Sequence, residues 1–168
     1  MKEVPMTLAI EMKGITKFFP STQVRANEGV DFSVESGEVH ALVGENGAGK
    51  TTLMNILYGL IKPDSGDIFI DSGQVHIGHP DDAIKHGIGM VHQHFKLVPS
   101  FTVAQNILLG MEPSQAGFLN QQKENKLVDE LAKKFNLPVD PSAHIWDLPV
   151  SMQQRVEILK VLERKAKI

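Results

Sequence analysis

The sequence predicts a mixed α/β fold, and three observations predict it. An apolar run, EVHALVG, leads directly into a glycine-rich stretch at residues 44–51, and a helical apolar pattern follows from about Lys50. Short alternating segments bounded by turn residues lie on both sides of this unit. From about Phe95 onward, the apolar residues recur mainly at helical spacing. The front of the chain is therefore expected to be mixed α and β, and the back to be helical.

Length and composition are those of a globular protein with one main domain. The chain has 168 residues, of which 42% are hydrophobic and 22% charged, so it is long enough to bury a real core. Its formal net charge of −3 gives no basis for binding nucleic acid or an anionic membrane through the chain as a whole. Cysteine is absent, which excludes disulfides and thiolate metal sites. No apolar run reaches the roughly 18 residues of a membrane span and no signal peptide is evident, so we expect a cytoplasmic protein.

The first part is expected to hold strands around one helix. LAIEMKGITKFF (8–19) and VDFSVESGE (30–38) alternate partly, as strands do, and EVHALVG (38–44) is a third, largely apolar strand. GDIFID and QVHIG, in residues 66–78, predict a short hairpin. The helix from about Lys50 has an apolar face formed by Leu53, Ile56, Leu57 and Leu60. It ends before residues that break helices, which are Pro63, Asp64 and Gly66.

The second part is expected to hold one strand and several helices. Pro80 and Gly87 are placed as the start and end of a helix, and GIGMVHQ (87–93) predicts a strand. Thr102 is suited to cap a helix over VAQNILLG. Apolar spacing predicts a helix through about Asn136, marked by Leu127, Val128, Leu131 and Phe135. It also predicts a last helix from about Met152 to Arg164.

The glycine-rich stretch GENGAGKT (Gly44 to Thr51) matches the phosphate-loop pattern G-x-x-x-x-G-K-[ST], with a strand before it and a helix after it. Glycines permit close approach of phosphate oxygens, and the exposed amides and helix N-terminus point at the anion. Lys50 supplies a positive charge to the β- and γ-phosphates, and the Thr51 hydroxyl is suited to ligate Mg²⁺. The expected ATP site comprises Gly44, Glu45, Asn46, Gly47, Ala48, Gly49, Lys50, Thr51 and Thr52. Kinases and GTPases also use such a loop, so the loop alone leaves the class of NTPase open.

Three further segments narrow the class. GITKFFP precedes the loop, and GMVHQHFKLVPSFTVAQNILLG and DLPVSMQQRVEILK follow it. Together with LVGENGAGKTTLMNILYGL, they resemble in order the ATP-binding subunits of ABC transporters, most closely importers of the simple-sugar and nucleoside type. The resemblance covers nearly the whole chain. It implies a P-loop NTPase (RecA-like) core with an antiparallel β subdomain, residues 1–95, and an α-helical subdomain, residues 96–168.

The resemblance also implies roles for single residues. Phe19 aligns with the aromatic residue that stacks on adenine. Gln93 aligns with the Q-loop glutamine, which contacts Mg²⁺ or the attacking water and senses the membrane partner, so Gln93 and Lys50 are the implied catalytic groups. Thr51 and Gln93 are the implied Mg²⁺ ligands. The LSGGQ-type signature, which reaches the γ-phosphate bound by a second subunit, corresponds to Leu148, Pro149, Val150, Ser151, Met152 and Gln153.

The signature segment departs from the family pattern, which is approximately Leu-Ser-x-Gly-x-Gln. Pro149 stands at the Ser position and Ser151 at the Gly position. Pro149 removes a hydroxyl and an N–H, and Ser151 adds a side chain where close backbone approach is needed. Each lost charge-assisted hydrogen bond costs about 1.5–3 kcal/mol. We therefore expect a weakened ATP-dependent dimer.

In the family, an apolar strand ending in Asp-Glu follows the signature helix, and a D-loop and a switch histidine come after it. Here VLERKAKI follows instead, so we expect little hydrolysis by this chain alone, although the family activity is ATP hydrolysis. We also expect the strands near Ala41 and Met90 to lack neighbours and to expose apolar surface. A split subunit, a damaged remnant and a truncated chain are all consistent with the sequence, as is a non-catalytic regulatory module.

The resemblance implies ATP and Mg²⁺ as cofactors. The implied partners are an ABC permease, a second ATP-binding subunit and, indirectly, a solute-binding protein, with no nucleic acid among them. The implied location is the cytoplasm, at the inner face of the cell membrane, and the implied cargo is a sugar- or nucleoside-like solute.

Overall fold

The computed structural model describes residues 7–115 and 118–168. The chain divides into two compact units. The first unit extends to Ile88 and includes Ile168, and the second, which we call the helical unit, is Gly89–Lys167.

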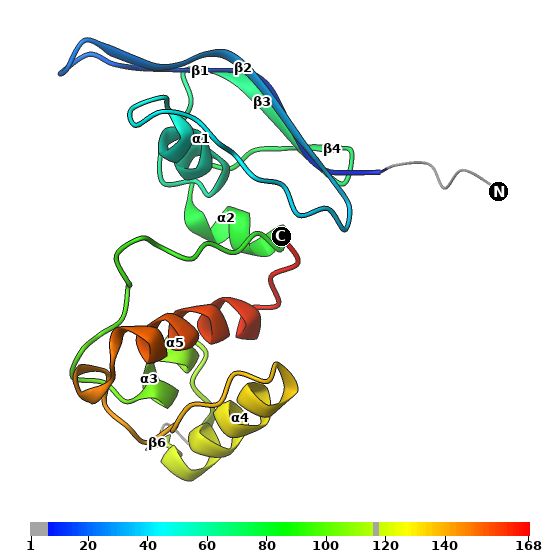
Figure 1. The fold of residues 1–168 in the computed structure, drawn as a ribbon. Helices are drawn as coiled ribbons and strands as arrows, with labels where there is room; N and C mark the ends of the chain where they lie inside the picture. Colours follow the sequence, from blue (N-terminus) through cyan, green and yellow to red (C-terminus); the bar gives the residue numbers. More distant parts are fainter. Residues whose placement is uncertain (1–6, 116–117) are drawn as a thin grey trace. The chain divides into compact units, whose positions relative to one another are not determined.

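A four-stranded antiparallel sheet forms one side of the first unit (Figure 1). Its strands are β1 (Leu8–Phe19), β2 (Val24–Glu35), β3 (Ser65–Ile70) and β4 (Gly73–Val75), in the order β2-β1-β3-β4. The first two strands and the hairpin predicted from the alternating segments are confirmed. β2 begins earlier than its apolar alternation indicated, because residues 24–27, which do not alternate, pair with the end of β1.

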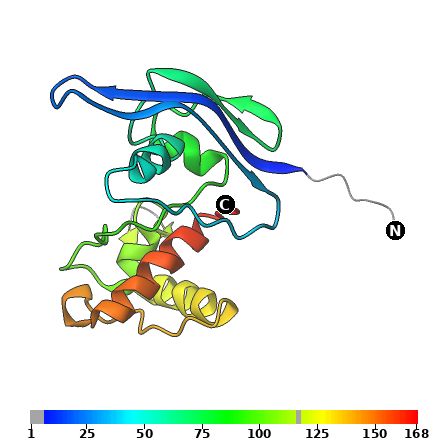
Figure 2. The ribbon, with the colours of Figure 1, turned by 45° about the horizontal axis from the view of Figure 1, so that its top comes forward.

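Two helices cover one face of this sheet, α1 (Lys50–Leu57) and α2 (Pro80–Lys85) (Figures 1 and 2). The predicted helix starts at Lys50 and Pro80 are confirmed. The core between helices and sheet is aliphatic; its buried members are Ile10, Met12, Ile15, Leu53, Ile56, Leu57, Ile68, Ile70, Ile77, Ala83 and Ile88. Leu60, which we expected on the apolar face of α1, lies beyond the end of that helix and is 48% exposed.

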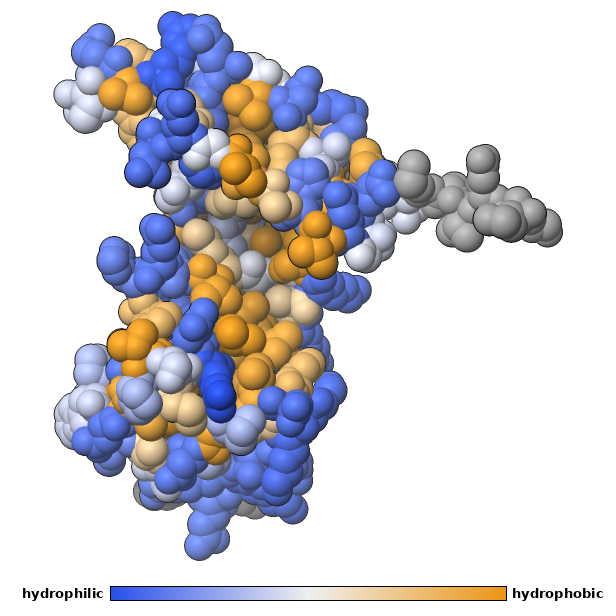
Figure 3. Space-filling model, in the orientation of Figure 1, coloured by the Kyte–Doolittle hydropathy of each residue, from blue (hydrophilic) through white to orange (hydrophobic). Residues whose placement is uncertain are grey.

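Two predicted strands, at residues 38–44 and 87–93, are wrong. Both segments lack strand pairing in the described part of the chain. The side chains of Val39 and Val43 are 99% and 87% exposed. An apolar run shows that a segment needs burial, but a strand also needs a hydrogen-bonded neighbour, and neither segment has one here. The expected exposure of apolar surface is confirmed, and Figure 3 shows apolar residues reaching the surface.

The helical unit contains α3 (Val103–Leu108), α4 (Gln121–Lys134) and α5 (Val150–Glu163), together with a 3₁₀ turn at Ile145–Asp147. The helices predicted there from apolar spacing are confirmed, whereas the small ladder of β5 (Ser114–Gln115) and β6 (Phe118–Leu119) was not predicted. The three helices share one apolar core; its buried members are Val103, Ala104, Ile107, Leu108, Val128, Ala132, Ile145, Val156 and Leu159. Within residues 7–115 and 118–168, no helix has the length and hydrophobicity needed to cross a bilayer.

Candidate functional site

The glycine-rich loop at residues 44–49 curls around the side chain of Lys50. The Lys50 ammonium donates hydrogen bonds to the carbonyl oxygens of Gly44 and Glu45, over 2.7 Å and 2.8 Å. Gly47 and Gly49 have φ values of 85° and 86°, in the left-handed region that glycine adopts without strain. The loop is thus wound with its cation at the centre, and most of its residues are exposed to solvent.

Gly49 is also required by packing against β2. A Cβ atom at this position would lie 2.1 Å from the carbonyl oxygen of Ala26, whereas one at Gly47 would meet nothing within 4 Å. The neighbouring Asn27, which is buried, donates from Nδ2 to the carbonyl of Gly49 over 3.4 Å. Neither Ala26 nor Asn27 is predicted as a site residue from the sequence. The one sequence signal is an asparagine within a strand, where that residue is uncommon.

The first turn of α1 is open to an anion. Its N-cap residue is Gly49, no side chain caps it, and the turn contains no acidic residue. The first amides of a helix have no intrahelical partner, and the helix dipole favours negative charge there. The Thr51 side chain in this turn belongs to an exposed residue. A glycine cradle, a central ammonium, open amides and a free hydroxyl together fit the phosphates of a nucleotide and its Mg²⁺.

α5 is the other helix that begins without a side-chain cap. Among the five α-helices of the described residues, α2 is capped by His79, α3 by Thr102 and α4 by Asn120. The N-cap of α5 is Pro149, whose side chain has no acceptor, and its first turn also lacks an acidic residue. The two uncapped helices are the ones that begin within the phosphate-loop and signature segments.

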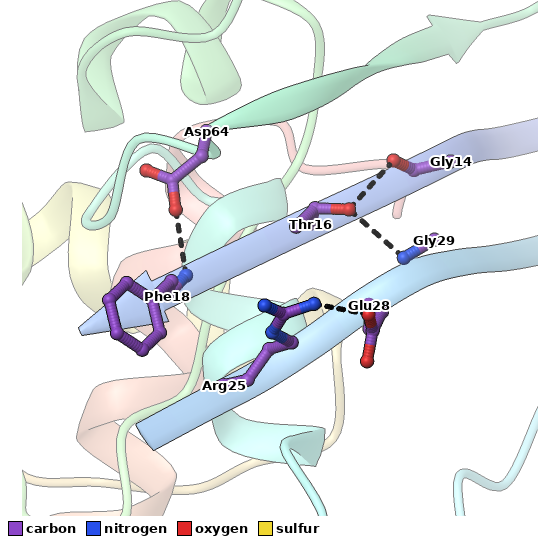
Figure 4. A network of polar contacts seen from close by, with 7 residues as sticks. All are labelled: Gly14, Thr16, Phe18, Arg25, Glu28, Gly29 and Asp64. Carbon is purple, nitrogen blue, oxygen red and sulfur yellow. Dashed lines mark hydrogen bonds and ion pairs between the residues drawn. The ribbon is translucent and has the colours of Figure 1, made fainter. Parts of the chain in front are cut away.

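A polar network that includes Asp64 and Phe18 holds the end of β1 (Figure 4). Phe19 is the last residue of this strand. The carboxylate of Asp64 accepts from Nζ of Lys17 over 2.8 Å and from the N–H of Phe18 over 2.7 Å. These two hydrogen bonds, the first above all, hold the pKa of Asp64 below its ordinary value. The Lys17 ammonium lies 5.7 Å from the centre of the Phe19 ring. The role of Phe19 toward adenine stays a prediction.

Gln93 and the signature glutamine Gln153 line one cavity of the helical unit. This cavity has a volume of about 330 Å³, and Phe95, Leu97 and Trp146 are among its other lining residues. Gln93 is exposed. The structure therefore brings together two predicted site residues that are 60 positions apart in the sequence.

The signature residues form the start of α5. Val150 and Ser151 are exposed in its first turn. The side-chain amide of Gln153 donates back to the carbonyl oxygens of Leu148 and Ile145, over 2.9 Å and 3.3 Å. Gln153 thus fixes the loop that leads into α5, and a role for it at a phosphate stays a prediction.

The chain is similar to known ATP-binding proteins along most of its length. The family model described as "ABC transporter" matches residues 27–168. The guanosine import ATP-binding protein NupO of Bacillus subtilis is 48% identical over 163 residues, which are 97% of this chain and 32% of that protein. The ribose import ATP-binding protein RbsA 1 of Rubrobacter xylanophilus is 45% identical over 159 residues, 95% of this chain and 32% of that protein. The chain thus spans about a third of the length of these relatives.

Solved structures show the same fold. A nucleotide-free ATP-binding cassette from an ABC transporter matches with a TM-score of 0.80 and 22% identity, covering 95% of this chain and 66% of that one. A dimeric bacterial ABC transporter cassette matches with a TM-score of 0.73 and 27% identity, covering 92% of this chain and 69% of that one. The fold is therefore that of a P-loop ATP-binding cassette, of which the chain spans about two thirds.

Proposed function

Because the chain belongs to the ABC transporter family of ATP-binding proteins, we propose that its residues 44–52 bind the phosphates of ATP with Mg²⁺. The observation that carries this proposal is the geometry of the loop: its ammonium lies inside a turn of glycines at the uncapped end of α1. Such an arrangement stabilises an anion through amides, helix dipole and charge together.

Each residue of the loop has a separate task. Lys50 exchanges its hydrogen bonds to the Gly44 and Glu45 carbonyls for bonds to phosphate oxygens, which carry more charge. Gly47 and Gly49 keep the backbone close to the anion. The Thr51 hydroxyl holds Mg²⁺, which neutralises charge on the β- and γ-phosphates when it is bound. Phe19, at the end of β1, stacks on the adenine.

The helical unit supplies the contacts with other subunits. Gln93 senses Mg²⁺ or the attacking water, and the start of α5 (residues 148–153) faces the nucleotide of a second ATP-binding subunit. For the function we keep the division predicted from the sequence, a nucleotide-binding part (1–95) and a signature part (96–168), whereas the compact units of the fold divide between residues 88 and 89. The permease lies against the Gln93 region, which places the subunit in the cytoplasm at the inner face of the membrane. The relatives named above carry guanosine or ribose import in their names, which supports a nucleoside- or sugar-like cargo.

A purified chain of these 168 residues is proposed to bind ATP but to hydrolyse it slowly. Catalysis of phosphoryl transfer depends on positioning and charge stabilisation, and these residues include no apolar strand that ends in Asp-Glu after α5. Rapid turnover by this chain would contradict the proposal. Binding without any turnover, alone or with a permease, would favour a regulatory module instead.

The test is calorimetric titration of the chain with ATP and Mg²⁺. Lys50→Ala is expected to weaken binding at least about tenfold, because it removes charge-assisted hydrogen bonds at the centre of the loop. Lys62→Ala is the matched control, since this exposed lysine of the first unit lies outside residues 44–52. Equal affinity of the Lys50→Ala and native chains would overturn the assignment of the loop.

A further inference from the structure

The segment that carries Gln93 is attached to α5 on both sides of that glutamine. On one side is Gly89, where an added Cβ atom would lie 2.2 Å from Cγ1 of Val161 in α5. The main chain of this segment therefore contacts the side of the helix directly. On the other side is Lys96, which is hydrogen-bonded to side chains of α5. Gln93 lies between these two attachment points in the sequence.

Lys96 has both of its main-chain polar groups bonded to α5. Its N–H donates to Oε1 of Glu157 over 3.4 Å, and its carbonyl accepts from Nζ of Lys160 over 2.9 Å. Glu157 and Lys160 are three residues apart, so they lie on one side of the helix. Glu157 is only 2% exposed, and burial lowers the pKa of Lys160. Both charged groups are therefore at least partly withdrawn from water where they meet this segment.

A second attachment follows at Val98. Its N–H donates to Oδ1 of Asn106 over 2.7 Å, and its carbonyl accepts from Nδ2 of the same side chain over 3.1 Å. Asn106 is fully buried in α3 and also donates to the carbonyl of Thr102 over 3.0 Å. Four hydrogen bonds to side chains thus pair the main-chain N–H and C=O groups of residues 96 and 98. In a sheet, a neighbouring strand would pair these groups.

We infer that Glu157 and Lys160 are positioning residues for Gln93: they join its segment to α5, so that the glutamine and the signature residues move as one body. Hydrogen bonds suit this task because they fix distance and angle, whereas apolar packing tolerates sliding. The meaning of the coupling for nucleotide binding rests on the proposed function. The attachment itself does not, since it follows from the contacts of residues 89–98.

Amide hydrogen exchange of the full chain tests the attachment. Glu157→Leu and Lys160→Met are expected to raise the exchange rates at residues 96–98 at least about tenfold, while the amides of α4 keep their native rates. Glu157→Gln and Lys160→Arg preserve the acceptor and the donor, so they are expected to remain within about threefold of the native rates. Lys123→Met, which removes an exposed lysine of α4, is the matched control.

The fluorescence emission of Trp146 provides a second test. If Lys160 had a purely structural role, its substitution would not change the response of this emission to ATP. Trp146 is the sole tryptophan of the chain and lines the same cavity as Gln93. Saturating ATP with Mg²⁺ is expected to change its emission in the native chain. In Lys160→Met the emission change is expected to fall at least about twofold while the ATP affinity stays within about twofold of native.

The outcomes separate this inference from the proposed function. Native exchange rates at residues 96–98 in both Glu157→Leu and Lys160→Met would overturn the inference, as would equal emission changes in native and Lys160→Met chains. Accelerated exchange throughout the helical unit would show a general loss of stability and would overturn it too. Absence of ATP binding to the native chain would instead refute the proposed function, and the exchange rates would still decide the attachment.

Discussion

The substitution Gly49→Ala distinguishes two reasons why the phosphate loop contains glycine: the left-handed backbone conformation and the lack of space for a side chain. Gly47 and Gly49 have nearly the same φ, 85° and 86°, so an alanine at either position bears the same backbone strain. They differ in their surroundings. A Cβ at Gly49 would lie 2.1 Å from the carbonyl oxygen of Ala26, and one at Gly47 has open space around it. Gly47→Ala is therefore a control for strain without steric conflict.

The expected magnitudes follow from these distances. The left-handed conformation costs an alanine about 1–2 kcal/mol, which is the whole effect expected at Gly47. The atom that blocks a Cβ at Gly49 belongs to the backbone of β2, so no rotamer change relieves the contact, and either the loop or the strand must move. Forced overpacking of this kind costs about 1–3 kcal/mol more. Gly49→Ala is thus expected to destabilise the first unit by about 2–5 kcal/mol in total.

Urea unfolding followed by far-ultraviolet circular dichroism measures both variants, and calorimetric titration measures their ATP affinity. Gly49→Ala is expected to be the less stable of the two and to bind ATP more weakly, because a displaced loop loses the position of its amides. Equal unfolding free energies for the two variants would refute the argument, since they would show that the contact with Ala26 does not constrain the loop.

Three further predictions concern other parts of the chain. Thr102→Ala removes the hydroxyl that caps α3 and should lower the unfolding free energy of the helical unit by about 1 kcal/mol, measured by tryptophan fluorescence in urea. Asp64→Asn should destabilise the first unit at neutral pH. The bond from Lys17 lowers the pKa of Asp64, so its contribution is present above its unfolded pKa, about 4, and disappears as the pH falls through the folded value; unfolding curves of the two chains should converge in acid. Pro149→Ser combined with Ser151→Gly should strengthen ATP-dependent dimerisation in a full-length subunit by about 1.5–3 kcal/mol per restored hydrogen bond, measured by sedimentation; an unchanged dimer would contradict this.

Local patterns predicted the helices well, because helix starts and apolar spacing depend on residues close together in the sequence. The predicted cap at Thr102 and the proline start of α2 are confirmed, and these features depend on residues within one turn. The two wrong strands, 38–44 and 87–93, fail for the opposite reason. A strand exists only through hydrogen bonds to another segment, and periodicity in one segment carries no information about its neighbour.

The residues of the candidate site also fall into those that local sequence predicts and those that it does not. The loop at residues 44–51 was predicted from its spacing, since phosphate binding here uses consecutive backbone groups. Ala26 and Asn27, which constrain Gly49, belong to β2, about 20 residues before the loop, so the spacing within the loop gives no indication of them. Glu157 and Lys160 were not predicted either, because a charged residue on a predicted helix is normally exposed to solvent.

The presence or absence of a side-chain cap at each helix start relates the phosphate loop to the signature segment. In a helix whose only task is structural, a side-chain cap satisfies free amides and stabilises the helix by about 1 kcal/mol. α2, α3 and α4 have such caps, and α1 and α5 do not. An uncapped start costs stability unless another acceptor satisfies the amides, and an anion at the N-terminus is the acceptor that also matches the dipole. For α1 that anion is the phosphate of the proposed site. For α5, Glu157 accepts a hydrogen bond from the Lys96 N–H and Lys160 donates one to the Lys96 carbonyl, so the segment of Gln93 is attached to the same helix. An acceptor bound at the first turn of α5 is therefore expected to constrain that segment as well.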